Sequence, residues 1–124
     1  MAAHTLLAAL MAVLTGHAQA APAPAPVLKK PRLDPVYSFT VTRSGVIVVV
    51  PSNGCTRKED FAARTSGPGR NAVIGFYRRR LDMCRSFAPG HAELRYGFAE
   101  LALSPNVTLK LLNGVTADPS PGVR

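Results

Sequence analysis

Three residues beyond position 20 are the best candidates for covalent or acid–base chemistry: Cys55, Cys84 and His91. The two cysteines allow a single disulfide. A pair of redox-active thiols is the alternative, although the close C-x-x-C spacing of redox motifs is absent. If both cysteines are bonded, His91 and scattered acids are too few to hold a metal ion. We therefore expect neither a metal nor a cofactor.

The sequence also lacks the usual motifs of hydrolases. His91 lies in a turn-like sequence. Ser86 and Ser104 are the candidate nucleophiles for it as a general base, but neither stands in a Gly-x-Ser-x-Gly elbow. The glycines of residues 66–71 are not followed by the Lys-Ser/Thr pair of a phosphate loop. We expect no enzymatic activity. The alternative is a small hydrolase or redox protein that uses His91 or the cysteine pair.

The most distinctive cluster is a run of arginines. Lys and Arg number 15 against 7 Asp and Glu, so the formal net charge is +8. Arginine forms forked contacts with phosphates and carboxylates. On a strand, Arg78 and Arg80 would share one face and Arg79 the other, so they form a single patch only if the run ends in a loop. Arg78, Arg79, Arg80 and Arg85 are predicted to contact an anionic partner, an envelope component or an envelope protein; a solvated strand end is the simpler alternative.

The N-terminal residues predict export. Residues 6–14 are apolar and uncharged, and Ala18-Gln19-Ala20 matches the small-x-small pattern of a signal peptidase site. We predict a signal peptide over residues 1–20. Its apolar run is far shorter than the roughly 20 residues that span a bilayer, so we expect no stable membrane span. The expected location is the periplasm or the exterior, where oxidising conditions favour a Cys55–Cys84 disulfide.

Composition divides the rest of the chain into three parts. Five of the 11 prolines lie between residues 22 and 35, so residues 21–35 are predicted to form an extended, proline-rich linker. Residues 36–116 are predicted to fold as one small domain and residues 117–124 to form a flexible tail. A domain of this size has a marginal apolar core, so the disulfide should contribute substantially to its stability.

Alternation of apolar and polar residues predicts mainly strands. The segments are 37–42, 46–50, 61–64, 72–79, 92–98 and 107–111. Residues 46–50 are apolar throughout and are expected to be covered on both faces. The capping-box spacing at Thr56–Glu59 predicts, as an alternative, a helix over 57–64. Residues 98–103 are a second exception, where a short helical turn is expected. The predicted fold is a small antiparallel β-sheet or sandwich of about six strands, with at most two short helices and one disulfide.

The segments around the cysteines resemble small exported bacterial proteins of unknown function. The resemblance is carried by Cys55-Thr-Arg-Lys-Glu-Asp-Phe61, by residues 80–90 and by Phe98-Ala-Glu-Leu101. It implies a periplasmic, disulfide-linked domain and transfers no catalytic residue. We predict a non-enzymatic periplasmic binding or accessory protein. A further alternative is an inhibitor that inserts the loop over residues 66–71 into the cleft of an enzyme.

Overall fold

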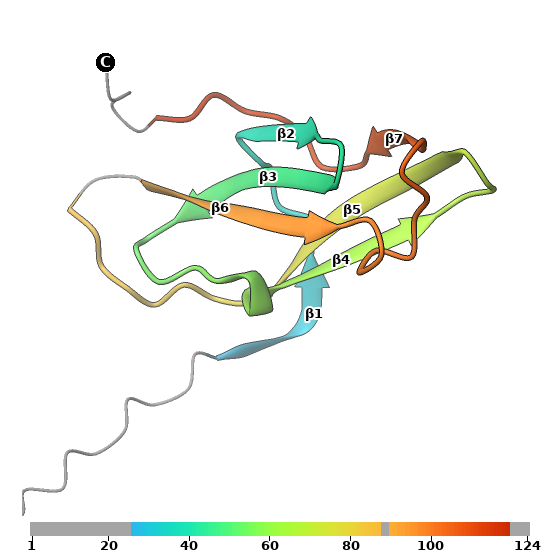
Figure 1. Ribbon diagram of the computed structural model, residues 1–124. Coiled ribbons are helices and arrows are strands. Elements are labelled where there is room, and N and C mark those ends of the chain that lie inside the picture. The colour runs from blue at the N-terminus through green and yellow to red at the C-terminus, as the bar shows by residue number, and fades with distance from the viewer. Residues whose placement is uncertain (1–25, 88–89, 120–124) are drawn as a thin grey trace, which may run out of the picture.

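The computed structural model describes residues 26–87 and 90–119, which form seven strands and one 3₁₀ turn (Figure 1). The predicted signal peptide over 1–20, the beginning of the linker and residues 120–124 of the tail lie outside these described residues. The elements are β1 (Val27–Arg32), β2 (Ser38–Val41), β3 (Gly45–Ser52), η1 (Lys58–Asp60), β4 (Phe61–Ser66), β5 (Asn71–Arg80), β6 (Gly90–Gly97) and β7 (Thr108–Leu111).

The strands form two sheets, which confirms the predicted mainly β fold. One sheet has the order β2-β3-β6, with antiparallel pairs throughout. In the other, β5 pairs with β4 along one edge, and along its opposite edge it pairs first with β7 and then with β1. The β5–β7 pair is parallel and the other two are antiparallel. Strands β4 and β5 form a hairpin, and the loop over residues 66–71 is its tip.

The core lies between the two sheets and is built from the inward-facing positions of each strand. On β3 the side chains of Val46, Val48 and Val50 are buried, while the alternating Ile47 and Val49 are only half-buried. The expected burial on both faces is therefore wrong for this strand, which is central in its sheet but has one wetter face. Phe76 of β5 packs across the core with its ring centroid 5.3 Å from that of Tyr96 on β6.

Strand β1 is a correction to the predicted linker over 21–35. Residues 27–32 pair with the end of β5, Val27 lying opposite Arg80 and Arg32 opposite Arg78, with an irregularity between the two pairs. Proline is compatible with an edge strand or a bulge, so Pro31 does not prevent the pairing. The folded part consequently begins before residue 36, and the structure has one more strand than the six predicted.

The helix considered for residues 57–64 is absent. A single 3₁₀ turn, η1, occupies Lys58–Asp60, and the capping carboxylate is that of Asp60, which accepts a hydrogen bond from the Arg57 amide at 2.8 Å. Residue 61 then enters β4 because Phe61 is buried in the core. Tertiary packing of this phenylalanine outweighs the local capping signal.

The helical turn expected over residues 98–103 is present. The Leu103 amide donates to the Phe98 carbonyl at 2.9 Å, and the Ala102 amide donates to the Ala99 carbonyl at 3.2 Å. This pair of bonds is the Schellman arrangement, in which the residue in the left-handed conformation is usually glycine. Here Ala102 occupies it, with a φ of 54°.

Candidate functional site

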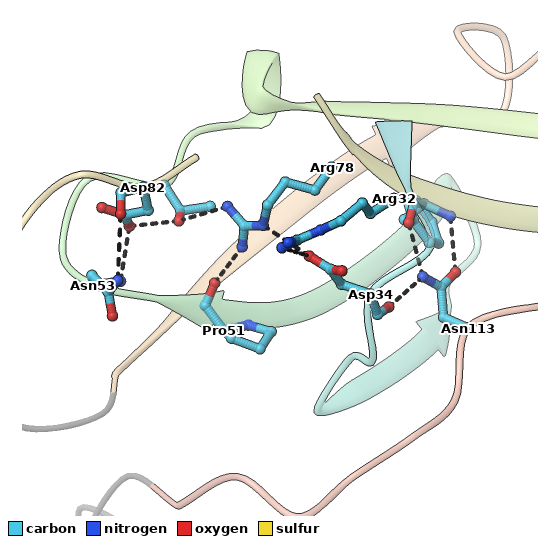
Figure 2. A network of polar contacts seen from close by, with 9 residues as sticks. Arg32, Asp34, Pro51, Asn53, Arg78, Asp82 and Asn113 are labelled. Atoms are coloured by element: carbon cyan, nitrogen blue, oxygen red, sulfur yellow. Dashed lines mark hydrogen bonds and ion pairs between the residues drawn. The ribbon is translucent and has the colours of Figure 1, made fainter. Parts of the chain in front are cut away.

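Arg78 is buried rather than displayed at the surface. It is 6% exposed and stacks over the Phe61 ring, with its guanidinium carbon 4.5 Å from the ring centroid. Its Nη2 donates to the Pro51 carbonyl at 2.8 Å, and its Nε lies 3.3 Å from the Asp34 carboxylate (Figure 2). Arg78 thus joins the two sheets from within, and its burial removes it from the group of four arginines predicted to meet a partner.

Asn113 completes the edge of β5 between β7 and β1. Its Oδ1 accepts a hydrogen bond from the Phe76 amide, and its Nδ2 donates to the Phe76 carbonyl and to the Asp34 carbonyl, each at 2.8 Å (Figure 2). The side-chain amide therefore replaces a neighbouring peptide group at a point where neither β7 nor β1 pairs with β5. Asn113 is 5% exposed. Sequence reasoning missed it, because its partners lie 37 and 79 positions away.

Asp82 holds together the two loops that carry the cysteines. Its Oδ2 accepts hydrogen bonds from the amides of Asn53 and Cys55 at 2.8 and 3.1 Å and from the Thr56 hydroxyl at 2.7 Å. The Ser52 hydroxyl donates to the same oxygen, and the Cys84 amide donates to Oδ1, both at 3.0 Å. We call this arrangement, the Asp82 carboxylate with its five donors, the Asp82 clasp.

The charge state of Asp82 follows from these donors. Partial burial alone would raise its pKa, but the hydrogen bonds from the Thr56 hydroxyl and from three backbone amides outweigh burial and lower the pKa from 3.8 to about 2. The carboxylate is therefore ionised near neutral pH and takes up no proton there.

The predicted disulfide between Cys55 and Cys84 is confirmed, with the two Cα atoms 5.6 Å apart. The sulfurs and the Asp82 carboxylate lie within 4.8 Å of one another, a spacing that a metal ion would accept. In the disulfide, however, neither sulfur is a thiolate and neither can serve as an anionic ligand. The fixed negative charge of Asp82 would also disfavour a thiolate beside it, which argues against redox-active thiols at this position.

The other three predicted arginines occupy separate positions near the end of β5. Arg79 is exposed, Arg80 is partly exposed and lies 4.0 Å from Asp60, and Arg85 is exposed in the loop that follows. Arg79 and Arg80 point to opposite faces of the strand, as the predicted alternation requires. The arginines therefore do not form one flat patch by themselves.

Strand β1 adds further cations beside Arg79 and Arg80. Because Val27 lies opposite Arg80 and Arg32 opposite Arg78, the exposed Lys29 and Lys30 fall next to the end of β5. We call Lys29, Lys30, Arg79 and Arg80 the basic edge. Within the described ranges 26–87 and 90–119, no ion pair involves Lys29, Lys30 or Arg79. Three of the four charges thus face solvent without an acidic partner from this part of the chain.

His91 lies on β6 and is exposed, with Nδ1 2.9 Å from the Asp118 carboxylate. This contact places part of the predicted tail against the domain. The loop over residues 66–71 is exposed at the tip of the β4–β5 hairpin, and Gly67 and Gly69 adopt positive φ values of 107° and 57° there. Both groups are accessible, and the hydrolase and inhibitor alternatives built on them stay predictions.

Two clefts border these elements. One, of about 410 Å³, lies beside the Arg78 network, and its basic residues, Arg32 and Arg78, are matched by the acids Asp34 and Asp82. The other, of about 430 Å³, contains Tyr96, Lys58 and Glu100. Burial, together with the negative charges of Glu100 and Glu59, raises the pKa of Tyr96 to about 12, so its hydroxyl is not a base near neutral pH. Neither cleft has a surplus of positive charge that would attract an anion.

No protein-family model, curated protein or solved structure shows significant similarity to this chain. The described residues contain no helix that is both long enough and apolar enough to cross a membrane. The resemblance to small exported bacterial proteins therefore stays a prediction. The candidate site is therefore described from this chain alone, by the Asp82 clasp, the disulfide and the basic edge.

Proposed function

We propose that this chain is an exported, non-enzymatic binding protein that recognises an anionic envelope partner through its basic edge. The observation that carries the proposal is the pairing of β1 with β5, which adds Lys29 and Lys30 to Arg79 and Arg80. Exposed cations with no acidic partner contribute most to long-range attraction, because their field is not cancelled locally. Arg85 extends the same charge into the following loop.

The internal contacts of Arg78 support this choice of residues. Arg78 of β5 donates a hydrogen bond to the Pro51 carbonyl and forms an ion pair with Asp34, so its charge is used within the folded domain. The Asp82 clasp and the Cys55–Cys84 disulfide hold the loop after β5 in place. The backbone that carries the partner-facing cations is thereby held in one conformation, so less conformational entropy is lost when a partner binds.

A heparin column tests the basic edge. Heparin is a polyanion that does not share the structure of an envelope component, so its binding reports on the attraction between charges. The test variant carries Lys29→Glu, Lys30→Glu and Arg79→Glu. Arg80 is left unchanged because Asp60 lies beside it. The matched control carries the same number of charge reversals at exposed cations outside the basic edge: Arg43→Glu, Arg70→Glu and Lys110→Glu.

We expect the basic-edge variant to elute at clearly lower salt than the control variant, although both have the same net charge. Each lost phosphate or sulfate contact reduces the salt dependence of binding. If the two variants elute together, net charge alone governs binding and the basic edge is not a site.

Export is tested separately. The apolar segment over 6–14, the Ala18-Gln19-Ala20 sequence and the disulfide support it. Amino-terminal sequencing of the mature protein should begin at Ala21. An intact amino terminus on a protein recovered from the cytoplasm would contradict this part of the proposal.

A further inference from the structure

We infer that the anionic partner is a lipid surface, which the loop after β5 enters with two apolar side chains while the surrounding cations contact phosphate headgroups. This inference rests on the proposed function and names its partner class. The residues are Met83 and Phe87, with Arg85 between them in sequence and Arg79 and Arg80 of the basic edge a few residues before them. We call Met83, Arg85 and Phe87 the apolar loop.

Exposure of the two apolar side chains is the first observation. Phe87 is fully exposed, and Met83 is 63% exposed. A lone exposed aliphatic residue is ordinary, whereas a fully exposed phenylalanine four residues after an exposed methionine leaves two large apolar side chains of one loop in water. These two side chains can gain hydrophobic stabilisation only from something outside the described part of the domain.

The second observation is that the base of this loop is fixed. Cys84 lies directly after Met83 and is bonded to Cys55, and Asp82 lies directly before Met83 in the clasp. Met83 is therefore held at a fixed point of the surface and cannot readily fold back onto the core. Figure 1 shows the loop leaving β5 beside η1, at the end of the molecule opposite the β4–β5 hairpin tip.

Charge selects the class of partner. Amphipathic segments that lie in a membrane interface combine basic residues with Phe, Leu or Trp, and anionic lipids attract the basic residues. Here Arg79 and Arg80 precede the apolar loop, and Arg85 stands between its two apolar side chains. The Asp82 carboxylate lies between Arg80 and Met83, and its charge is engaged by the five donors of the clasp. A soluble polyanion would engage the same cations but would leave Phe87 in water. An anionic lipid surface satisfies both sets of residues.

A single introduced tryptophan provides a direct test, because the chain contains none. The Phe87→Trp variant is mixed with vesicles of phosphatidylglycerol and phosphatidylcholine, and its fluorescence emission is compared with that in vesicles of phosphatidylcholine alone. We expect a blue shift with the anionic vesicles and quenching by brominated acyl chains. The control is Val41→Trp, an exposed position at the end of β2, far from the apolar loop in Figure 1, whose emission should not move. Unshifted emission from the Phe87→Trp variant, on protein that sediments with the vesicles, would overturn the inference.

Sedimentation separates this inference from the proposed function. The variant Met83→Ser with Phe87→Ser should bind anionic vesicles about tenfold more weakly or worse, because the apolar area no longer leaves water. Its elution from heparin should be unchanged. The basic-edge variant should bind both heparin and anionic vesicles more weakly. Its affinity for the vesicles should fall by about fivefold for each cation that is replaced.

The remaining outcomes are equally decisive. Wild-type protein that binds heparin but not anionic vesicles would refute the lipid surface and leave the proposed function standing. Protein that binds neither would refute both. Vesicle binding that survives the two serine substitutions would show that charge acts alone and would overturn the role of Met83 and Phe87.

Discussion

Replacing Asp82 with asparagine should destabilise the fold at neutral pH and leave it little changed in strong acid. In Asp82→Asn, one carboxylate oxygen becomes an amide nitrogen, which cannot accept the hydrogen bonds that the clasp provides. If the amide oxygen takes the Oδ2 position, the new nitrogen faces the Cys84 amide, and two donors then oppose each other. The negative charge that orders the Ser52–Thr56 loop is also lost.

The magnitude follows from the shift in pKa. A fall from 3.8 to about 2 corresponds to roughly 2 kcal/mol of preference for the ionised form, at 1.36 kcal/mol per pKa unit. The Asp82 side chain retains contact with water, which screens part of this interaction. We therefore expect Asp82→Asn to lower the free energy of unfolding by about 1 to 2 kcal/mol at pH 7.

The pH dependence has a defined direction. Because the pKa of Asp82 is lower in the folded state, its contribution is complete at a pH well above 3.8 and disappears as the pH falls through about 2. The wild-type protein should lose this part of its stability over that range. Asp82→Asn carries no titrating group at position 82, and the remaining carboxylates are common to both proteins, so the difference between the two should shrink toward zero.

Urea unfolding followed by circular dichroism, with the disulfide intact, measures this difference at several pH values between neutrality and pH 2. Glu93→Gln, at an exposed carboxylate on β6, is the control for removing one negative charge. A difference that stays constant across the pH range would refute the assignment, since the ionised clasp would then not be the source of the stability.

Three further predictions concern the fold. Urea unfolding with the disulfide intact checks the two substitutions, and thermal unfolding after reduction checks the disulfide. Asn113→Leu should cost about 3 kcal/mol, because it leaves the buried Phe76 amide and carbonyl without partners; a loss below about 1 kcal/mol would contradict the role of Asn113 in the ladder. Ala102→Gly should stabilise the protein by up to about 1 kcal/mol, because glycine adopts the positive φ of this position without strain, and destabilisation would contradict the turn assignment. Reducing the Cys55–Cys84 bond, which spans 29 positions, should lower the free energy of unfolding by about 3 to 4 kcal/mol, and an unchanged thermal midpoint after reduction would argue against a stabilising disulfide.

Local signals in the sequence were sufficient for much of the β framework. The alternation at residues 92–98 correctly identifies the buried Leu94, Tyr96 and Phe98, because one face of β6 packs on the core. The glycines at residues 67 and 69 mark the hairpin tip through their positive φ values. The two cysteines allow only one pairing, so the disulfide required no structural information.

Long-range packing decided the features that the sequence did not reveal. Strand β1 resembles a linker because of Pro31 and its lysines, and only the free edge at the end of β5 makes it a strand. Arg78 looks like part of an exposed basic run, and only the position of Asp34 and Pro51 shows that it faces inward. The basic edge follows from the same pairing, since lysines near residue 30 meet arginines near residue 80.

Titration of ¹⁵N-labelled protein with short heparin fragments, followed by amide chemical shifts, tests the central claim most directly. If the basic edge is the site, the largest changes will fall on β1 and on the end of β5, and will continue into the loop that contains Arg85. Changes centred instead on the hairpin tip over residues 66–71, or on His91, would contradict the claim and favour one of the alternative functions.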